Sequence, residues 1–223
     1  MESWITIKPD SEVMDMKNFS KFISEKNAKI ASKFLCYVCY FIIFFFALCL
    51  VLSFMGRQTF TLHTNTGSYE NAIYAEEDHN PSSRFMTVNM AGDSVYVNST
   101  DDVIDPTIQI GLSLMYAIHI VPLIFAYWFL GKVFANVAKG KIFVEKNAAY
   151  LLRYGVINFL VALLVPFIKL LICQLINLIS VDSLSIGTGS TMLNDLILSI
   201  AFIVAAYIIH YGITLQDEVD HTL

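Results

Sequence analysis

Four long apolar stretches dominate the pattern of hydrophobic and polar positions along the chain. They cover residues 34–55, 108–130, 154–179 and 193–213. A helix needs about 20 mostly apolar residues to cross a bilayer. The pattern therefore predicts an all-α membrane protein, with four transmembrane helices packed as a bundle.

Residues 56–107, between the first two apolar stretches, are polar and alternate with apolar positions over short runs. The runs TFTLHT, RFMTV and SVYVNS have the period of two that is typical of strands. Ala91, Gly92 and Asp93 supply turn chemistry between Met86–Val88 and Val95–Val97. We expect a small exterior β-containing domain with at least one hairpin here, and a plain exterior loop at residues 180–192.

Three further polar segments complete the chain. Residues 1–33 place lysines and apolar side chains at helical spacing, which fits either an amphipathic helix lying in the membrane interface or a solvated helix leading into the first span. Residues 131–153 are predicted as a helix, a turn at Gly140 and a second helix, and residues 214–223 as an acidic tail.

The distribution of basic residues predicts the orientation of the chain. Eleven Lys or Arg residues lie in residues 1–33 and 131–153, whereas the segments on the other side of the membrane hold only Arg57 and Arg84. Cytoplasmic loops carry the excess of positive charge. Both termini are therefore expected in the cytoplasm. Tyr127 and Trp128, just before Lys132, fit the aromatic belt of that interface.

Composition narrows the function classes. Hydrophobic residues make up 56% of the 223 residues, charged residues 15%, and the net charge is −5, which argues against disorder and against direct nucleic-acid binding. Cys36 and Cys39 have the spacing of half a zinc site but no second pair. No catalytic motif is present either. We expect a non-enzymatic protein without a cofactor or metal.

Polar residues inside the apolar stretches are costly and mark sites of interest. Lys169, Gln174 and Asn177 share one side of the third stretch with Cys173, and Asp195 lies near the start of the fourth. Two interpretations of Lys169 stay open: an ion pair with Asp195, or extension of the side chain to the lipid headgroups. The shared side is expected to pack inside the bundle or to line a wet vestibule.

Two cytoplasmic motifs resemble a known family. The first is KGKIFVEKN at residues 139–147, followed by LRYG, and the second is YGITLQDEVDHTL at residues 211–223. Together they resemble the bacterial family of domain of unknown function 2975. The resemblance implies an inner-membrane protein without assigned catalysis, often encoded beside a small helix-turn-helix regulator. It implies a partner-binding surface formed by Gly140, Phe143, Asn147, Gln216, Asp217, Glu218 and Asp220.

A purely structural role for Gly140, Phe143 and Asn147 is the alternative, with Asn147 capping the helix that enters the third span. The leading functional hypothesis is a bacterial inner-membrane sensor or regulator that binds a cytoplasmic protein. One rival is an accessory or immunity-type subunit that binds an envelope protein or toxin, for example through Glu76–Asp78. Another is a lipid or small-molecule binder, or a transporter component. Ala201 and Ala205 also have a spacing compatible with homo-oligomerisation.

Overall fold

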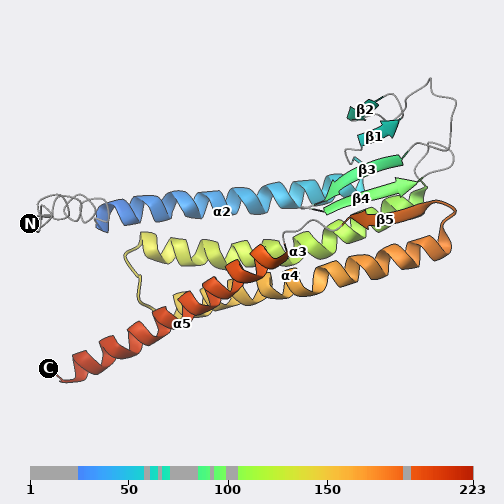
Figure 1. Cartoon of the computed structure of the whole chain (residues 1–223). Helices are drawn as coiled ribbons and strands as arrows, with labels where there is room; N and C mark the ends of the chain where they lie inside the picture. Colours follow the sequence, from blue (N-terminus) through green and yellow to red (C-terminus); the bar gives the residue numbers. More distant parts are fainter. Residues whose placement is uncertain are drawn as a thin grey trace, which may run out of the picture.

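The structure is a computed structural model, and it describes residues 25–57, 61–64, 67–70, 85–90, 93–98, 105–187 and 192–222. Its helices are α2 (Glu25–Phe54), α3 (Pro106–Ala138), α4 (Glu145–Ile179) and α5 (Met192–Thr222) (Figure 1). Its strands are β1 (Thr61–Thr64), β2 (Gly67–Glu70), β3 (Phe85–Met90), β4 (Asp93–Asn98) and β5 (Ser183–Gly187).

The four helices are long and apolar enough to cross a membrane. Many of their exposed side chains are large and apolar, such as Phe41, Phe44 and Phe45 of α2. The prediction of a multi-pass membrane protein with four helical spans is therefore confirmed. Each helix also continues beyond its apolar stretch: 35 residues in α4 correspond to about 50 Å, against a hydrocarbon core of about 30 Å.

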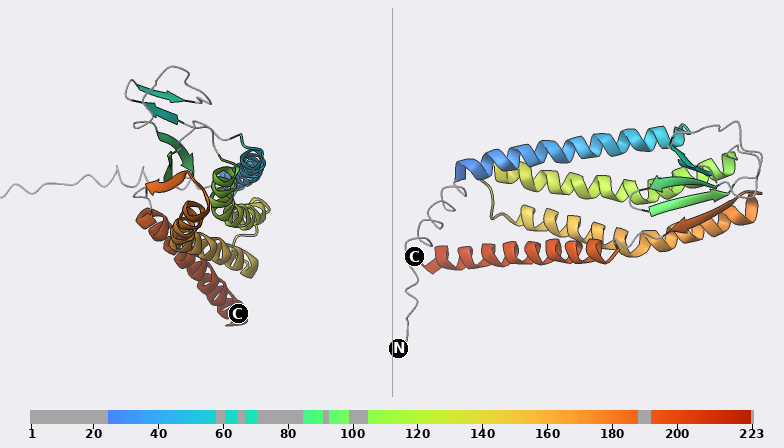
Figure 2. Two further views of the ribbon diagram at one scale, coloured as in Figure 1. Left: turned by 90° about the vertical axis from the view of Figure 1, so that its right-hand side faces the viewer. Right: turned by 45° about the horizontal axis from the view of Figure 1, so that its top comes forward.

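The helices pack in chain order, α2 on α3, α3 on α4 and α4 on α5. Figure 2 shows them as an open row in which α5 does not return to α2. The predicted bundle is thus observed as an open arrangement of neighbouring helices. Helix α5 begins only partway along α4, and the sheet lies beside the remaining part of α3 and α4 (Figures 1 and 2).

Aromatic and hydroxyl side chains join the helices. The ring of Tyr127 on α3 lies 6.0 Å from Phe46 and 6.1 Å from Tyr154, and the Tyr154 ring lies 4.8 Å from Phe202 on α5. Tyr127 therefore packs between helices, and only Trp128 of the predicted aromatic belt faces outward.

A buried hydroxyl pair joins α2 to α3. The Ser113 Oγ donates to the Ser53 carbonyl at 2.9 Å, and Gln109 donates to the same carbonyl at 3.0 Å. Both serines are buried. Ser53 lies near the end of α2, so this pair holds the end of α2 against the start of α3. Small hydroxyl residues at such a contact let two helix backbones approach each other closely.

The five strands form one antiparallel sheet in the order β2-β1-β3-β4-β5. The predicted hairpin is confirmed, because β3 pairs with β4 and Val88 lies opposite Val95. The expected turn residues Ala91 and Gly92 lie outside the described residues. The prediction of a plain loop at 180–192 was wrong, because Ser183–Gly187 form β5, which pairs with β4.

The sheet shares its core with the helices instead of forming a separate unit. Its apolar face packs on the first turns of α3 and the last turns of α4. The strand residues in this core are Val88, Val95, Val97 and Leu184, and the helix residues are Ile108, Leu112, Met115, Ile172, Cys173 and Ile176. The alternation predicted from the sequence explains this packing for β4, where Val95 and Val97 are buried and the positions beside them are less so.

Candidate functional site

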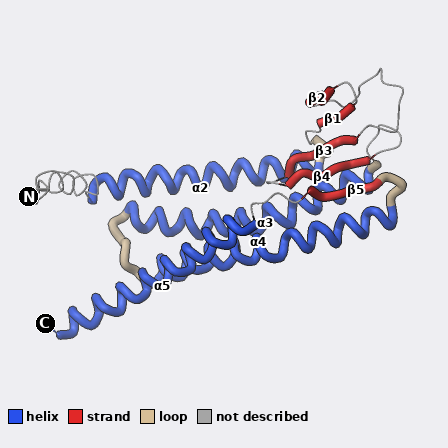
Figure 3. Tube along the Cα trace, viewed as in Figure 1, coloured by secondary structure: helices blue, strands red, loops and turns tan. Residues whose placement is uncertain are grey.

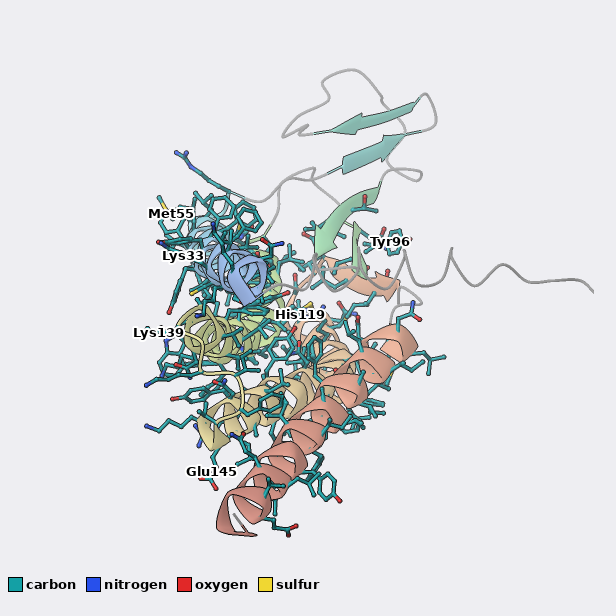
Figure 4. All side chains as sticks on the ribbon, turned by 90° about the vertical axis from the view of Figure 1, so that its left-hand side faces the viewer. Lys33, Met55, Tyr96, His119, Lys139 and Glu145 are labelled. Carbon is teal, nitrogen blue, oxygen red and sulfur yellow. The ribbon has the colours of Figure 1, made fainter. Side chains whose placement is uncertain are left out.

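The start of α2, the turn between α3 and α4, and the last turns of α5 lie at the same end of the molecule (Figure 3). We call this end the turn end, and the opposite end the sheet end. The turn end holds the two sequence motifs, at residues 139–147 and 211–223. It also holds most of the basic residues of the described part of the chain, including Lys33 and Lys139, which Figure 4 labels together with Glu145.

Asn147 holds the turn between α3 and α4 in shape. Its Nδ2 donates to the carbonyls of Lys141, at 2.7 Å, and Ile142, at 2.9 Å. Its Oδ1 accepts from the Asn136 Nδ2 at 2.8 Å. The side chain is buried, with 1% of its surface exposed. The predicted capping role was wrong: the N-cap of α4 is Val144, and Asn147, inside the first turn, bonds across to the loop and to α3.

Gly140 makes this turn possible. Its φ of +78° lies in the left-handed region, which side-chain-bearing residues rarely adopt. A Cβ at this position would also lie 3.1 Å from the Lys29 side chain of α2. The predicted helix, glycine turn and helix are thus observed, and the turn additionally contacts the first described helix.

Phe143 brings the two motifs together. A Cβ at Gly212 of α5 would lie 3.7 Å from the Phe143 ring, so the ring packs over the glycine backbone. Phe143 nevertheless keeps 57% of its surface exposed. The 139–147 motif and the 211–223 motif, about 70 residues apart in sequence, therefore meet at Phe143 and Gly212.

Beyond this contact, α5 continues past the turn and away from the other helices (Figures 1 and 2). Gln216 and Glu218 on these last turns are exposed. The side chains of Asp217 and Asp220 lie outside the described residues, although their backbone belongs to α5. The tail predicted as an acidic extension is thus helical as far as Thr222.

The polar side of α4 packs on the sheet. The Asn177 side chain donates to the Leu184 carbonyl at 2.9 Å and accepts from the Leu184 N–H at 2.7 Å. The Cys173 thiol donates to the same carbonyl at 3.0 Å. These bonds fix β5 along α4. Of the residues predicted to share this side, Gln174 is instead exposed.

Lys169 and Asp195 have different environments. Lys169 is enclosed, with 2% of its surface exposed, whereas Asp195 is exposed on the first turn of α5. A side chain so fully enclosed does not extend outward to the headgroups, so that interpretation of Lys169 was wrong, whereas the ion pair with Asp195 stays a prediction.

Asp105 is a structural residue that the sequence analysis did not single out. Its Oδ1 accepts from the Thr107 N–H at the start of α3, and its Oδ2 accepts from the Ser180 hydroxyl at 3.1 Å, at the end of α4. The signal was present: an Asp before a Pro is a common start of a helix. Asp105 ties the two helix ends that carry the sheet.

Several predictions fall on residues outside the described part of the chain. They include the segment before Glu25 and the acidic residues Glu76–Asp78. Within the described part, Cys36, Cys39, Cys49 and Cys173 are free thiols, and no group of three or more His, Cys, Asp or Glu side chains is close enough to hold a metal ion. Cys39 and Cys173 are buried among apolar side chains.

No family model matches the chain, and no curated protein or solved structure matches it. The case for a function therefore comes from the geometry of the turn end and from the two short motifs that meet there.

Proposed function

We propose that the chain is a non-enzymatic bacterial inner-membrane regulator that docks a basic cytoplasmic protein, such as a small DNA-binding regulator, at its turn end. The observation that carries the proposal is the contact of Phe143 with Gly212, at which the two motifs meet. The excess of Lys and Arg at this end supports a cytoplasmic position.

The surface combines a fixed part and an extended part. The Asn147 hydrogen bonds hold the turn, so Phe143 is presented in one position. The end of α5 extends beyond it with acidic residues that favour a basic partner through electrostatic complementarity. The tail and DNA would therefore compete for the basic face of a partner that binds nucleic acid.

The same two helices join this surface to the sheet. The apolar face of the sheet packs on α3 and α4, and these helices run on to the turn that carries Phe143. A ligand or envelope protein that shifts the sheet would therefore act on the turn through α3 and α4. This route gives the proposed regulator an input on the opposite side of the membrane.

Photocrosslinking in native cells tests the proposal. Photoreactive amino acids replace Phe143 and Glu218 at the turn end, and Ser185, exposed on β5, serves as the control position. We expect a small basic protein to be captured at the turn-end positions and not at Ser185. Capture at Ser185 alone would favour the accessory or immunity function, and capture of only the chain itself would contradict a protein-docking function.

A charge-neutralised tail tests the electrostatic part. The triple variant Asp217→Asn, Glu218→Gln, Asp220→Asn keeps the length of the helix and removes three charges. We expect capture at Phe143 to fall about tenfold, because three surface ion pairs contribute roughly 1.5 kcal/mol together. The control Glu145→Gln removes an exposed acid from the same end. Equal capture by the triple variant and the control would contradict the role of the tail.

A further inference from the structure

Two cations on the surface of α3 and α4 are held by aromatic rings. The Lys132 Nζ lies 3.4 Å from the centroid of the Trp128 ring and 5.4 Å from that of Tyr150. The Arg153 guanidinium carbon lies 5.3 Å from the centroid of the Phe129 ring. Contacts of this kind orient a cation without neutralising it.

The rings form a platform that crosses from one helix to the other. The Phe129 ring of α3 stacks on the Tyr150 ring of α4 with centroids 6.0 Å apart and an interplanar angle of 27°. Trp128 lies 5.2 Å from Phe129 and keeps 41% of its surface exposed. Lys132 and Arg153 thereby lie over one connected group of rings on the α3–α4 pair.

Neither cation has an acidic partner in the described part of the protein. Within those residues, Lys132 and Arg153 form no ion pair, α3 contains no Asp or Glu, and the only acid of α4 is Glu145, two turns before Arg153. Two oriented charges without an anion form an electrostatically incomplete site. Within the described part of the chain, no Asp or Glu of α3 or α4 supplies the negative group that would complete the site.

The position of the pair identifies that group. Lys132 follows the last residue of the second apolar stretch by only two positions, and Phe125, one turn before Trp128, is exposed. The surface is therefore apolar on the membrane side and cationic at its border, which matches the acyl chains and the phosphate of a lipid. We propose that this cluster, Trp128, Phe129, Lys132, Tyr150 and Arg153, is a binding site for one anionic glycerophospholipid.

Tryptophan fluorescence offers a direct test, because the chain has two tryptophans, Trp4 and Trp128. In a Trp4→Phe background, the emission reports on the site alone. The full chain is reconstituted into phosphatidylcholine vesicles that contain increasing fractions of either brominated phosphatidylglycerol or brominated phosphatidylcholine. Bromine on the acyl chains quenches a tryptophan only at close approach.

We expect brominated phosphatidylglycerol to reach half-maximal quenching at a mole fraction about tenfold lower than brominated phosphatidylcholine, as two interfacial cations predict. The pair Lys132→Gln, Arg153→Gln should remove this preference. The exchange Lys132→Arg, Arg153→Lys keeps both charges and should retain it, which separates loss of the site from loss of folding.

The matched control is the pair Lys141→Gln, Lys146→Gln, which removes the same charge from exposed positions at the same end. Within the described part of the chain neither lysine contacts an aromatic ring, so the preference should change less than about twofold. Two results would contradict the proposed lipid binding at this cluster. One is equal quenching by the two lipids, and the other is equal loss of preference in the control and in the test pair.

Discussion

At the scale of single residues, Asn147 shows how much a sequence motif reveals. Its place in the loop motif marked it as a residue of interest, but its expected bond was to the helix end. In the structure it bonds to Asn136 and to two loop carbonyls instead. An Asn near a helix start predicts a local cap, whereas its actual partners depend on how α3 and α4 pack. Tertiary contacts of this kind leave no local pattern.

Substitution of Asn147 tests this role. The change Asn147→Ala removes three hydrogen bonds, those to the Lys141 and Ile142 carbonyls and to the Asn136 amide, so we expect the free energy of unfolding to fall by roughly 2–3 kcal/mol. Thermal unfolding in detergent measures the effect. The control is Asn158→Ala, which removes a bond within one helix, from the Asn158 Nδ2 to the Tyr154 carbonyl, and should cost less than about 1 kcal/mol. Equal losses would contradict the special role of Asn147.

At the scale of elements, hydropathy identified all four described helices, because a run of about 20 apolar residues is long enough to cross a bilayer. The alternation of polar and apolar residues likewise identified the hairpin of β3 and β4. Strand β5 was not predicted, because Ser183–Gly187 form a short run whose partner, β4, lies about 85 residues earlier. Whether such a run is a strand or a loop depends on a pairing that no local window contains.

Two glycines in the helices are expected to respond differently to substitution by alanine. A Cβ at Gly155 of α4 would lie 3.0 Å from the Ile203 nitrogen and 3.1 Å from the Ser199 carbonyl oxygen, both on the backbone of α5. At Gly131 of α3 the nearest atom is the Cys39 Cβ, at an ordinary contact distance of 3.5 Å. We therefore expect Gly155→Ala to move α5 away from α4, and Gly131→Ala to be tolerated.

The distance between spin labels at Phe159 and Tyr207 measures this movement, since these positions lie on α4 and α5. Gly155→Ala should also lower the free energy of unfolding by roughly 1–3 kcal/mol, the cost of an overpacked contact. An unchanged distance and unchanged stability in Gly155→Ala would show that the close approach of α4 and α5 is absent.

At the scale of the whole molecule, the structure places both described ends of the chain on one side and the sheet on the other (Figure 1). The even number of apolar stretches predicted this arrangement, because a chain that crosses the membrane four times ends on the side where it began. The open order of the helices was not predictable in the same way. Hydropathy marks which residues meet lipid or protein, but it does not say which helices are neighbours.

Labelling in intact cells tests the orientation. In a background with the four native cysteines replaced by serine or alanine, single cysteines are introduced at Ser185 and at Glu218, both exposed. A maleimide that does not cross membranes should label the cysteine at 185 in intact cells. The same maleimide should label the cysteine at 218 only after the membrane has been permeabilised. The reverse pattern would contradict the cytoplasmic position of the turn end.

The pairing of β5 with β4 also has a consequence for the order of assembly. Asn98 and Ser183 meet in this pairing, and the chain between them contains the whole of α3 and α4. During synthesis β4 keeps an open edge until both helices have crossed the membrane and β5 has followed them. Completion of the sheet is therefore a late, long-range step. Its final strand is added only once three helices are already in place.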